Sequence, residues 1–250
     1  MRGWIQESVM VDSAMASVDT AVLGAVGDIP RKPWYVSFGQ LLRKQPLGAA
    51  GGLIVLLMLL ATVFANVLSP YDPEAASFEH MLMPPNADFW FGTDAFGRDI
   101  LTRIIYGART ALFVGFTAAF VGATAGLVLG VASAYFGGLF DLIFQRLVDV
   151  VMAFPLIVLA LAVVATLGAS TTNVIIAITI PFIPQCARVV RSSALAIREI
   201  PYVDAARALG FGHARIILRH MVPNVMAPYL IMLTTFVGHA ILLEASLSYL

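Results

Sequence analysis

The chain has 250 residues, of which 60% are hydrophobic and only 12% are charged. Because soluble globular domains carry about 25% charged residues, this composition excludes an ordinary soluble domain and predicts a protein that lies in a lipid bilayer. The formal net charge of zero argues against a nucleic-acid partner, and the single cysteine, Cys186, excludes an internal disulfide framework.

Five apolar stretches are long enough to cross the hydrocarbon core as helices. In chain order they are Leu47–Leu68, Ala111–Phe136, Val148–Gly168, Asn173–Val190 and Val225–Leu247. The sequence therefore predicts an all-α, polytopic membrane bundle over residues 47–250. Acidic side chains interrupt residues 1–46, which lack the continuous apolar core of a signal peptide and are predicted to form a polar tail.

Basic residues concentrate in alternate connections between these spans. Twelve of the 15 lie in the N-terminal tail, between the second and third spans, and in the segment 188–224, whereas three lie in the connection 69–110. Cytoplasmic loops carry the excess of lysine and arginine in membrane proteins. This distribution predicts that the N-terminus and the segment 188–224 are cytoplasmic and that the connection 69–110 is extracytoplasmic.

The connection 69–110 ends in a segment with one apolar side. If the segment is helical, one face contains Ile100, Leu101, Ile104, Ile105 and Ala108. The side chains of Arg98, Asp99 and Arg103 then remain in water. This pattern predicts a helix lying on the outer membrane surface. Two interpretations stay open, namely an external rim that supports a gate or receives a binding protein, and a purely structural elbow.

Small residues recur at every fourth position of the second span, at Ala118, Gly122, Gly126, Gly130 and Ala134. Membrane helices pack closely through such residues, because lipid supplies little hydrophobic force to hold helices together. The stripe predicts a close helix–helix contact. A role in lining a transport pathway is the alternative.

Prolines weaken two of the predicted spans. Pro155 lies one turn inside the third span, and Pro181 and Pro184 lie in the fourth. Because proline frees a carbonyl group and weakens the helix locally, Met152, Phe154 and Pro155 are candidate gate or pathway residues. Kinks that only shape the bundle are the competing explanation.

Glu244 lies late in the last predicted span. An ionisable group is costly there unless it faces the bundle interior or water, which makes Glu244 a fourth pathway candidate. The alternative is that its carboxylate reaches the nearby interface. The other spans offer no second acidic or imidazole group at depth for a proton relay or a metal site.

The segment Glu199–Asn224 is charged and helix-capable, and it lies between two apolar spans. It predicts two short helices, since Pro201 suits a first helical position, Asp204 falls in the first turn, and Gly210 can end a helix in the left-handed conformation. Ala205, Ala206 and Gly210 would form a small-residue patch that a partner backbone can approach closely. In a membrane protein such a segment is a candidate docking surface for a soluble partner.

This segment resembles the EAA loop of ABC transporter permeases, whose pattern is Glu-Ala-Ala, three residues, Gly, nine residues, Ile, one residue, Leu-Pro. The corresponding positions are Asp204, Ala205, Ala206, Gly210 and Pro223. The departures are Asp204 for glutamate, His220 for isoleucine and Val222 for leucine. Residues Phe91–Arg109 resemble a second signature, that of the dipeptide, oligopeptide and nickel branch of the same permeases.

The resemblance implies a type I ABC importer permease in the bacterial inner membrane, translocating peptides or a related small solute such as nickel. It implies a homologous permease, two cytoplasmic ATPases and an extracytoplasmic solute-binding protein as partners. It also implies a sixth span after Glu244–Leu250, so we expect the 250 residues to be a truncated product or fragment. The residues that would dock the ATPase are Asp204, Ala205, Ala206, Leu209, Gly210, Arg215 and Pro223.

No catalytic signature is present. The sequence lacks the phosphate-binding loop of P-loop ATPases and the motifs of intramembrane hydrolases, so we predict a transport subunit without enzymatic activity, cofactor or metal. Two other classes remain as alternatives, an ion-coupled secondary transporter and a membrane scaffold without a transport role. A secondary transporter would be expected to show inverted repeats and ionisable residues at the midplane, and neither is evident.

Overall fold

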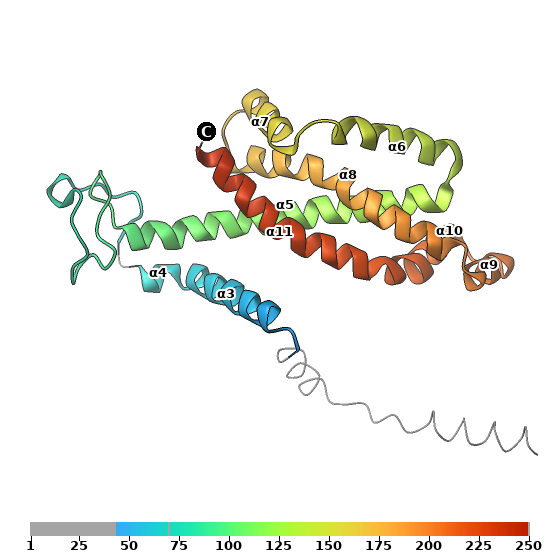
Figure 1. Cartoon of the computed structure of the whole chain (residues 1–250), viewed down its shortest axis with the longest axis horizontal. Coiled ribbons are helices and arrows are strands. Elements are labelled where there is room, and N and C mark those ends of the chain that lie inside the picture. The colour runs from blue at the N-terminus through green and yellow to red at the C-terminus, as the bar shows by residue number, and fades with distance from the viewer. Residues whose placement is uncertain (1–43, 70, 250) are drawn as a thin grey trace, which may run out of the picture. The chain divides into compact units, whose positions relative to one another are not determined.

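The computed structural model describes residues 44–69 and 71–249, so the predicted N-terminal tail lies almost entirely outside the described residues. The described part is helical and contains no strand, only one isolated antiparallel bridge between Thr93 and Asp99. The all-α prediction is therefore confirmed (Figure 1). The chain divides into two units, Met1–Leu57 and Met58–Leu250, and the packed bundle belongs to the second.

The main helices are α3 (Pro46–Val63), α4 (Ala65–Leu68), α5 (Ile100–Phe136), α6 (Gly138–Met152), α7 (Leu156–Leu167), α8 (Thr171–Arg198), α9 (Pro201–Ala208), α10 (His213–Ile216) and α11 (Met226–Tyr249). A π-helical turn (Ile217–Met221) and a 3₁₀ turn (Val222–Val225) join α10 to α11, and a short 3₁₀ turn (Phe78–His80) lies in the loop before α5. Within the described residues, four helical runs are long and apolar enough to cross a bilayer, namely α3, α5, α8 and His213–Tyr249. The pair α6 and α7 makes a fifth if it forms one bent span.

The third span is not the single helix Val148–Gly168 that the sequence predicts. The structure begins α6 ten residues earlier, at Gly138, breaks the helix after Met152 and starts α7 at Leu156, with an angle of 87° between the two. Pro155 causes the break, since it has no N–H to donate and disfavours helical geometry at Phe154. Pro181 and Pro184 do not break α8, where both are buried.

The predicted surface helix at residues 100–108 is also wrong as a separate element. It forms the first turns of α5, which runs for 37 residues, or about 55 Å at 1.5 Å per residue. No helix-breaking residue separates this segment from the apolar span that follows. Because a hydrocarbon core is about 30 Å thick, α5 is long enough to extend beyond it.

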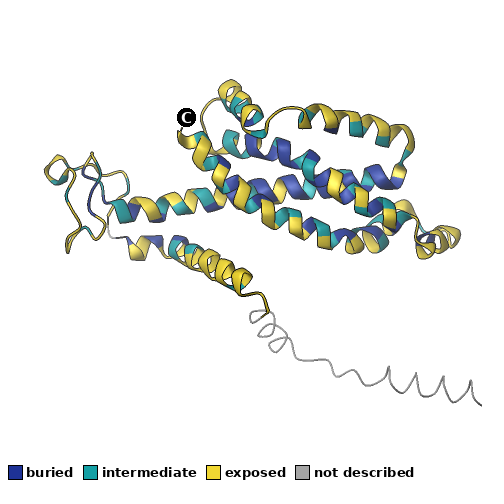
Figure 2. Ribbon diagram, viewed as in Figure 1, coloured by how far each residue is buried: buried dark blue, intermediate teal, exposed yellow. Residues whose placement is uncertain are grey.

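The small-residue stripe of α5 lies against α8, and the prediction of close packing is confirmed. A Cβ atom added at Gly126 would lie 2.6 Å from the Cβ of Cys186 and 2.9 Å from the carbonyl oxygen of Ile183. At Gly130 it would lie 2.6 Å from the carbonyl oxygen of Ala187. The two helices run parallel, since successive residues of α5 meet successive residues of α8, and the residues between them are buried (Figure 2).

Helix α11 packs on the same α5 in the opposite direction. A Cβ atom at Gly115 would lie 2.7 Å from Cγ1 of Ile241, while Thr124, further along α5, bonds the hydroxyl of Tyr229 at 3.1 Å. The rings of Phe182 on α8 and Phe236 on α11 stack at 4.1 Å between centroids. This arrangement of α5, α8 and α11 has the directions expected for the second, fourth and fifth spans of an alternating bundle.

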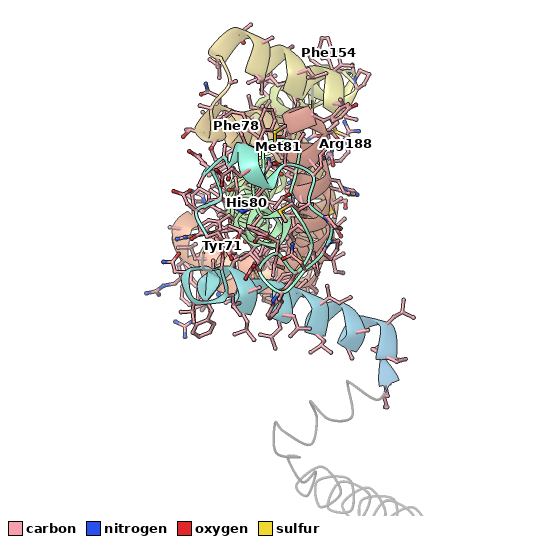
Figure 3. The ribbon with its side chains drawn as sticks, turned by 90° about the vertical axis from the view of Figure 1, so that its left-hand side faces the viewer. Tyr71, Phe78, His80, Met81, Phe154 and Arg188 are labelled. Carbon is pink, nitrogen blue, oxygen red and sulfur yellow. The ribbon has the colours of Figure 1, made fainter. Side chains whose placement is uncertain are left out.

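The loop before α5 is held by close backbone packing and by hydrogen bonds to the Asp94 carboxylate. At Gly97, where φ is +73°, an added Cβ would lie 1.8 Å from the carbonyl oxygen of Ser77. Desolvation raises the pKa of the Asp94 carboxyl, but hydrogen bonds from the amides of Arg98 and Phe96 and the side chains of Arg98 and Arg103 outweigh it and hold that pKa well below its usual range. Figure 3 looks onto this loop and shows Tyr71, Phe78, His80 and Met81 on it.

Candidate docking site

Helix α9 has the local structure that its sequence predicts. Pro201 occupies the first turn, Asp204 adds an acidic side chain there, and Gly210 takes the left-handed conformation with φ of +75° just after the helix. The second short helix does not end where the sequence predicts. It begins at His213 and continues through the π-helical and 3₁₀ turns into α11, because Pro223 lies in the first turn of the 3₁₀ segment, where proline is tolerated.

The residues of the predicted small-residue patch on α9 differ in burial. Ala206 is only 4% exposed and packs in the core together with Val203, so it is unavailable to a partner. Asp204, Ala205, Leu209 and Gly210 are exposed, and Leu209 is 74% exposed although it is large and apolar. The expectation that all three small residues face a partner is therefore wrong for Ala206, whereas Ala205 and Gly210 do lie on the surface.

The start of α10 and the side chain of Arg207 contact the end of α5. The hydroxyl of Tyr135 lies 2.7 Å from Nδ1 of His213, and Cζ of Arg207 lies 5.6 Å from the centre of the Tyr135 ring. Arg207 also pairs with Asp204, with Nη1 donating to Oδ1 at 2.9 Å. Tyr135 is therefore a point at which the segment carrying α9 is fixed to the membrane bundle.

A second set of contacts joins α9 to the π-helical turn. Tyr202 donates its hydroxyl hydrogen to the carbonyl oxygen of His220 at 3.0 Å, and Asn224 donates to the same carbonyl at 2.7 Å and to the Tyr202 hydroxyl at 2.9 Å. Arg215 lies over the ring of Phe211, with Cζ 5.1 Å from its centre. The π-turn leaves the His220 carbonyl open to these side chains, which hold the segment in one shape.

The ends of α5 and α8 meet beside α9. Nη1 of Arg198 donates to the carbonyl oxygen of Ala134 at 2.8 Å, satisfying a group in the last turn of α5 that has no helical partner. Gly137, with φ of +63°, then turns the chain into α6. A Cβ atom there would lie 3.2 Å from Nη1 of Arg198, so the turn and the arginine are closely fitted.

Two ion pairs connect α6 to α8. Asp141 accepts from both Nε and Nη2 of Arg191 and from the hydroxyl of Ser133, in a partly buried position. Asp149 pairs with Arg188 in a more exposed position. Since exposed pairs contribute little and bidentate, partly buried pairs contribute more, Asp141 is the stronger anchor of α6.

The four pathway candidates are not brought together. Met152, Phe154 and Pro155 lie exposed at the break between α6 and α7, and Figure 3 shows Phe154 at the edge of the bundle. Glu244 is half-buried on α11. An apolar groove of about 210 Å³ between α6 and α8 is lined by residues such as Phe144, Val148 and Pro184, and by none of the four candidates. Their role in a pathway stays a prediction.

Sequence reasoning missed the residues that position the docking segment, namely Tyr135, His213, Tyr202 and Asn224. Tyr135 and His213 are 78 positions apart, so no spacing signal relates them. Leu209, which the sequence analysis placed in the docking set, is exposed, and its contact with a partner stays a prediction.

Residues 122–250 match the model of a protein family described as the binding-protein-dependent transport system inner membrane component. This match covers more than half of the chain. The chain belongs to this family. Residues 33–85 additionally match the N-terminal transmembrane domain of oligopeptide transport permease C.

Several curated proteins are similar over most of the chain. A protein of Brucella suis, named as a permease of a peptide transport system, is 43% identical over 89% of this chain and 75% of its own length. The dipeptide transport system permease protein DppC of Alkalihalophilus pseudofirmus is 41% identical over 87% of this chain and 71% of its own length. The glutathione transport system permease protein GsiD of Escherichia coli is 38% identical over 89% of this chain and 74% of its own length.

Family membership establishes the class of the protein. It is a multi-pass inner-membrane permease subunit of an ABC transporter, and it is not an enzyme, because in this family ATP is hydrolysed on separate subunits. ATPase and binding-protein partners are general features of the family. The permease resemblance seen in the sequence is therefore confirmed.

Proposed function

We propose that this permease subunit imports peptides and that the exposed face of α9 docks the ATPase. Relatives named for peptide, dipeptide and glutathione transport, each at least 38% identical, support the substrate class. The observation that carries the docking role is the exposed Leu209, beside Ala205 and Gly210, on a segment fixed to the bundle through His213 and Tyr135.

The chemistry of this surface suits a protein partner. Leu209 offers a large apolar side chain, and the removal of apolar surface from water favours protein–protein association. Ala205 and Gly210 present little bulk, so a partner backbone can approach closely. Because Tyr135 bonds His213, a displacement of the docking segment would be transmitted directly to the end of α5. Asp204, Arg215 and Pro223 complete the proposed docking set.

The transport pathway is proposed to form against a homologous permease, with two ATPases on one side of the membrane and a solute-binding protein on the other. Met152, Phe154 and Pro155 support this arrangement, since they lie exposed at the α6–α7 break of the single chain. Glu244 is half-buried and could line the same shared pathway. Each of these residues would be covered in an assembly of two permeases.

The proposed orientation places α9 in the cytoplasm. In a Cys186→Ala background, which has no cysteine, we expect Ala205→Cys to resist a membrane-impermeant thiol reagent in intact cells and Ala87→Cys to react with it. The positive-inside distribution of basic residues is the reason. Permeabilised cells that express the permease without its ATPase, in which both variants should react, serve as the control, and labelling of Ala205→Cys alone in intact cells would reverse the proposed topology.

Uptake in proteoliposomes tests the transport function. The chain, assembled with its homologous permease, ATPases and binding protein, should accumulate a labelled dipeptide only when ATP is present, and a catalytically inactive ATPase should abolish accumulation. Uptake driven by an ion gradient without ATP would instead indicate a secondary transporter. The absence of uptake from an intact, ATP-hydrolysing assembly would contradict the proposed substrate class.

A further inference from the structure

A pocket lies where the loop Tyr71–Asp99 meets the start of α5 and the end of α4. Its volume is about 230 Å³, and six residues that line it are Leu68, Tyr71, Asp88, Trp90, Asp99 and Leu101. All of them belong to the packed unit Met58–Leu250. The pocket is far along the chain from α9 and has no part in the docking proposal.

Asp99, one of the residues that line this pocket, has an unsatisfied acceptor. Its side chain caps α5, with Oδ2 accepting from the amide of Thr102 at 2.9 Å and from its hydroxyl at 2.5 Å, and the residue is only 6% exposed. Its other oxygen, Oδ1, is buried and has no hydrogen-bond partner among the described residues. A buried polar atom without a partner is costly and uncommon, so a ligand that donates a hydrogen bond would be favoured here.

The charges around the pocket favour a cation. Arg98 and Arg103, the neighbouring basic residues, are both paired with Asp94, whose depressed pKa keeps it ionised. Within the described part of the chain, neither Asp88 nor Asp99 forms an ion pair. The N-terminus of α5 compensates part of the charge on Asp99, which leaves the Asp88 carboxylate as an uncompensated negative group at the pocket.

The side chains that line the pocket indicate which kind of cation would bind there. Tyr71 and Trp90 offer aromatic faces, which attract organic cations, while Leu68 and Leu101 can contact an apolar stem. The Tyr71 wall is held in place, because its hydroxyl donates to the carbonyl oxygen of Asp88 at 3.2 Å and its ring packs 5.2 Å from that of Phe89. A metal ion fits less well, since the described residues contain no group of three or more His, Cys, Asp or Glu side chains that could hold one.

We propose that this pocket binds a primary ammonium group on a short apolar stem, with Asp99 Oδ1 and Asp88 accepting its hydrogen bonds. Two sources present this chemistry. One is a dissolved amine, such as the amino terminus of a small peptide. The other is the ethanolamine headgroup of a phospholipid, because the pocket adjoins the apolar run that ends at Leu68.

Tryptophan fluorescence of the full chain in nanodiscs tests the proposal. The chain has three tryptophans, so Trp4→Phe with Trp34→Phe leaves Trp90 as the single reporter in the pocket wall. In nanodiscs of phosphatidylglycerol alone, n-pentylamine should change Trp90 emission saturably, whereas 1-pentanol, which has the same stem without the charge, should not. Asp99→Asn should weaken pentylamine binding about tenfold, because asparagine keeps the helix cap but removes the charge and replaces one acceptor with a donor.

A matched variant and two competition arms complete the experiment. Asp72→Asn changes a carboxylate of the loop that is exposed and does not line the pocket, and this variant should leave the affinity for pentylamine unchanged. Competition by phosphatidylethanolamine in the nanodisc identifies the lipid source. Competition by a dipeptide with a free amino terminus, but not by its N-acetylated form, identifies the dissolved source.

Three outcomes would overturn the proposal. Equal responses to pentylamine and pentanol would show that the pocket recognises only the apolar stem. An unchanged affinity in Asp99→Asn, or an equal loss in Asp72→Asn, would show that the Asp99 carboxylate is not the recognition group. None of these measurements requires the ATPase, so their result is separate from that of the peptide-uptake test.

Discussion

Replacing Ala205 with glutamate is expected to leave the permease folded while lowering ATP-driven uptake about tenfold or more. Ala205 lies exposed on α9, so the larger side chain is accommodated in the free protein. When the ATPase docks, the same carboxylate is removed from water without a partner, and such burial costs more than the 1.4 kcal/mol that corresponds to a factor of ten. Uptake and ATPase activity, measured together in proteoliposomes, should show hydrolysis that no longer drives transport.

Two variants show whether this loss arises from docking. Ala205→Ser keeps the residue small and should transport normally. Ala206→Glu changes the neighbouring buried position and should instead reduce the amount of folded protein, because the carboxylate would enter the core. Normal coupling in Ala205→Glu would contradict the assignment of α9 as the docking surface, even if the family assignment stands.

Gly126→Leu is expected to abolish the folded bundle. A Cβ atom alone would lie 2.6 Å from the Cβ of Cys186 and 2.9 Å from a backbone oxygen of α8, and neither neighbour can move without separating the helices. Overpacking of a core costs about 1–3 kcal/mol where side chains can adjust, and more where backbone must shift. Fluorescence-detected size exclusion in detergent should show loss of the monodisperse peak and of its thermal transition.

Gly107→Leu is the matched control, because it makes the same substitution in the same helix. No atom lies within 4 Å of a Cβ added at Gly107, and leucine has a higher helix propensity than glycine. This variant should therefore elute and melt at least as well as the original protein. Equal behaviour of the two variants would mean that the α5–α8 contact does not control the fold.

Local features of this protein could be predicted from the sequence because they depend on short stretches of chain. Apolar runs of span length, the four-residue spacing of Gly122, Gly126 and Gly130, and the Pro201 and Gly210 boundaries of α9 each follow from hydropathy, helical periodicity or backbone geometry. The family resemblance rested on the same kind of short pattern, and it was confirmed.

Other features depended on which helix lies beside which, and only the tertiary structure decided them. Proline breaks the helix at Pro155, where the preceding residue Phe154 is exposed, but not at Pro181 and Pro184, which are buried within α8. Likewise the structure buries Ala206 and exposes its neighbour Ala205. Contacts such as Tyr135 with His213, and the pocket that contains Asp99, join residues from separate elements, and their energies depend on distances that the order of residues alone does not contain.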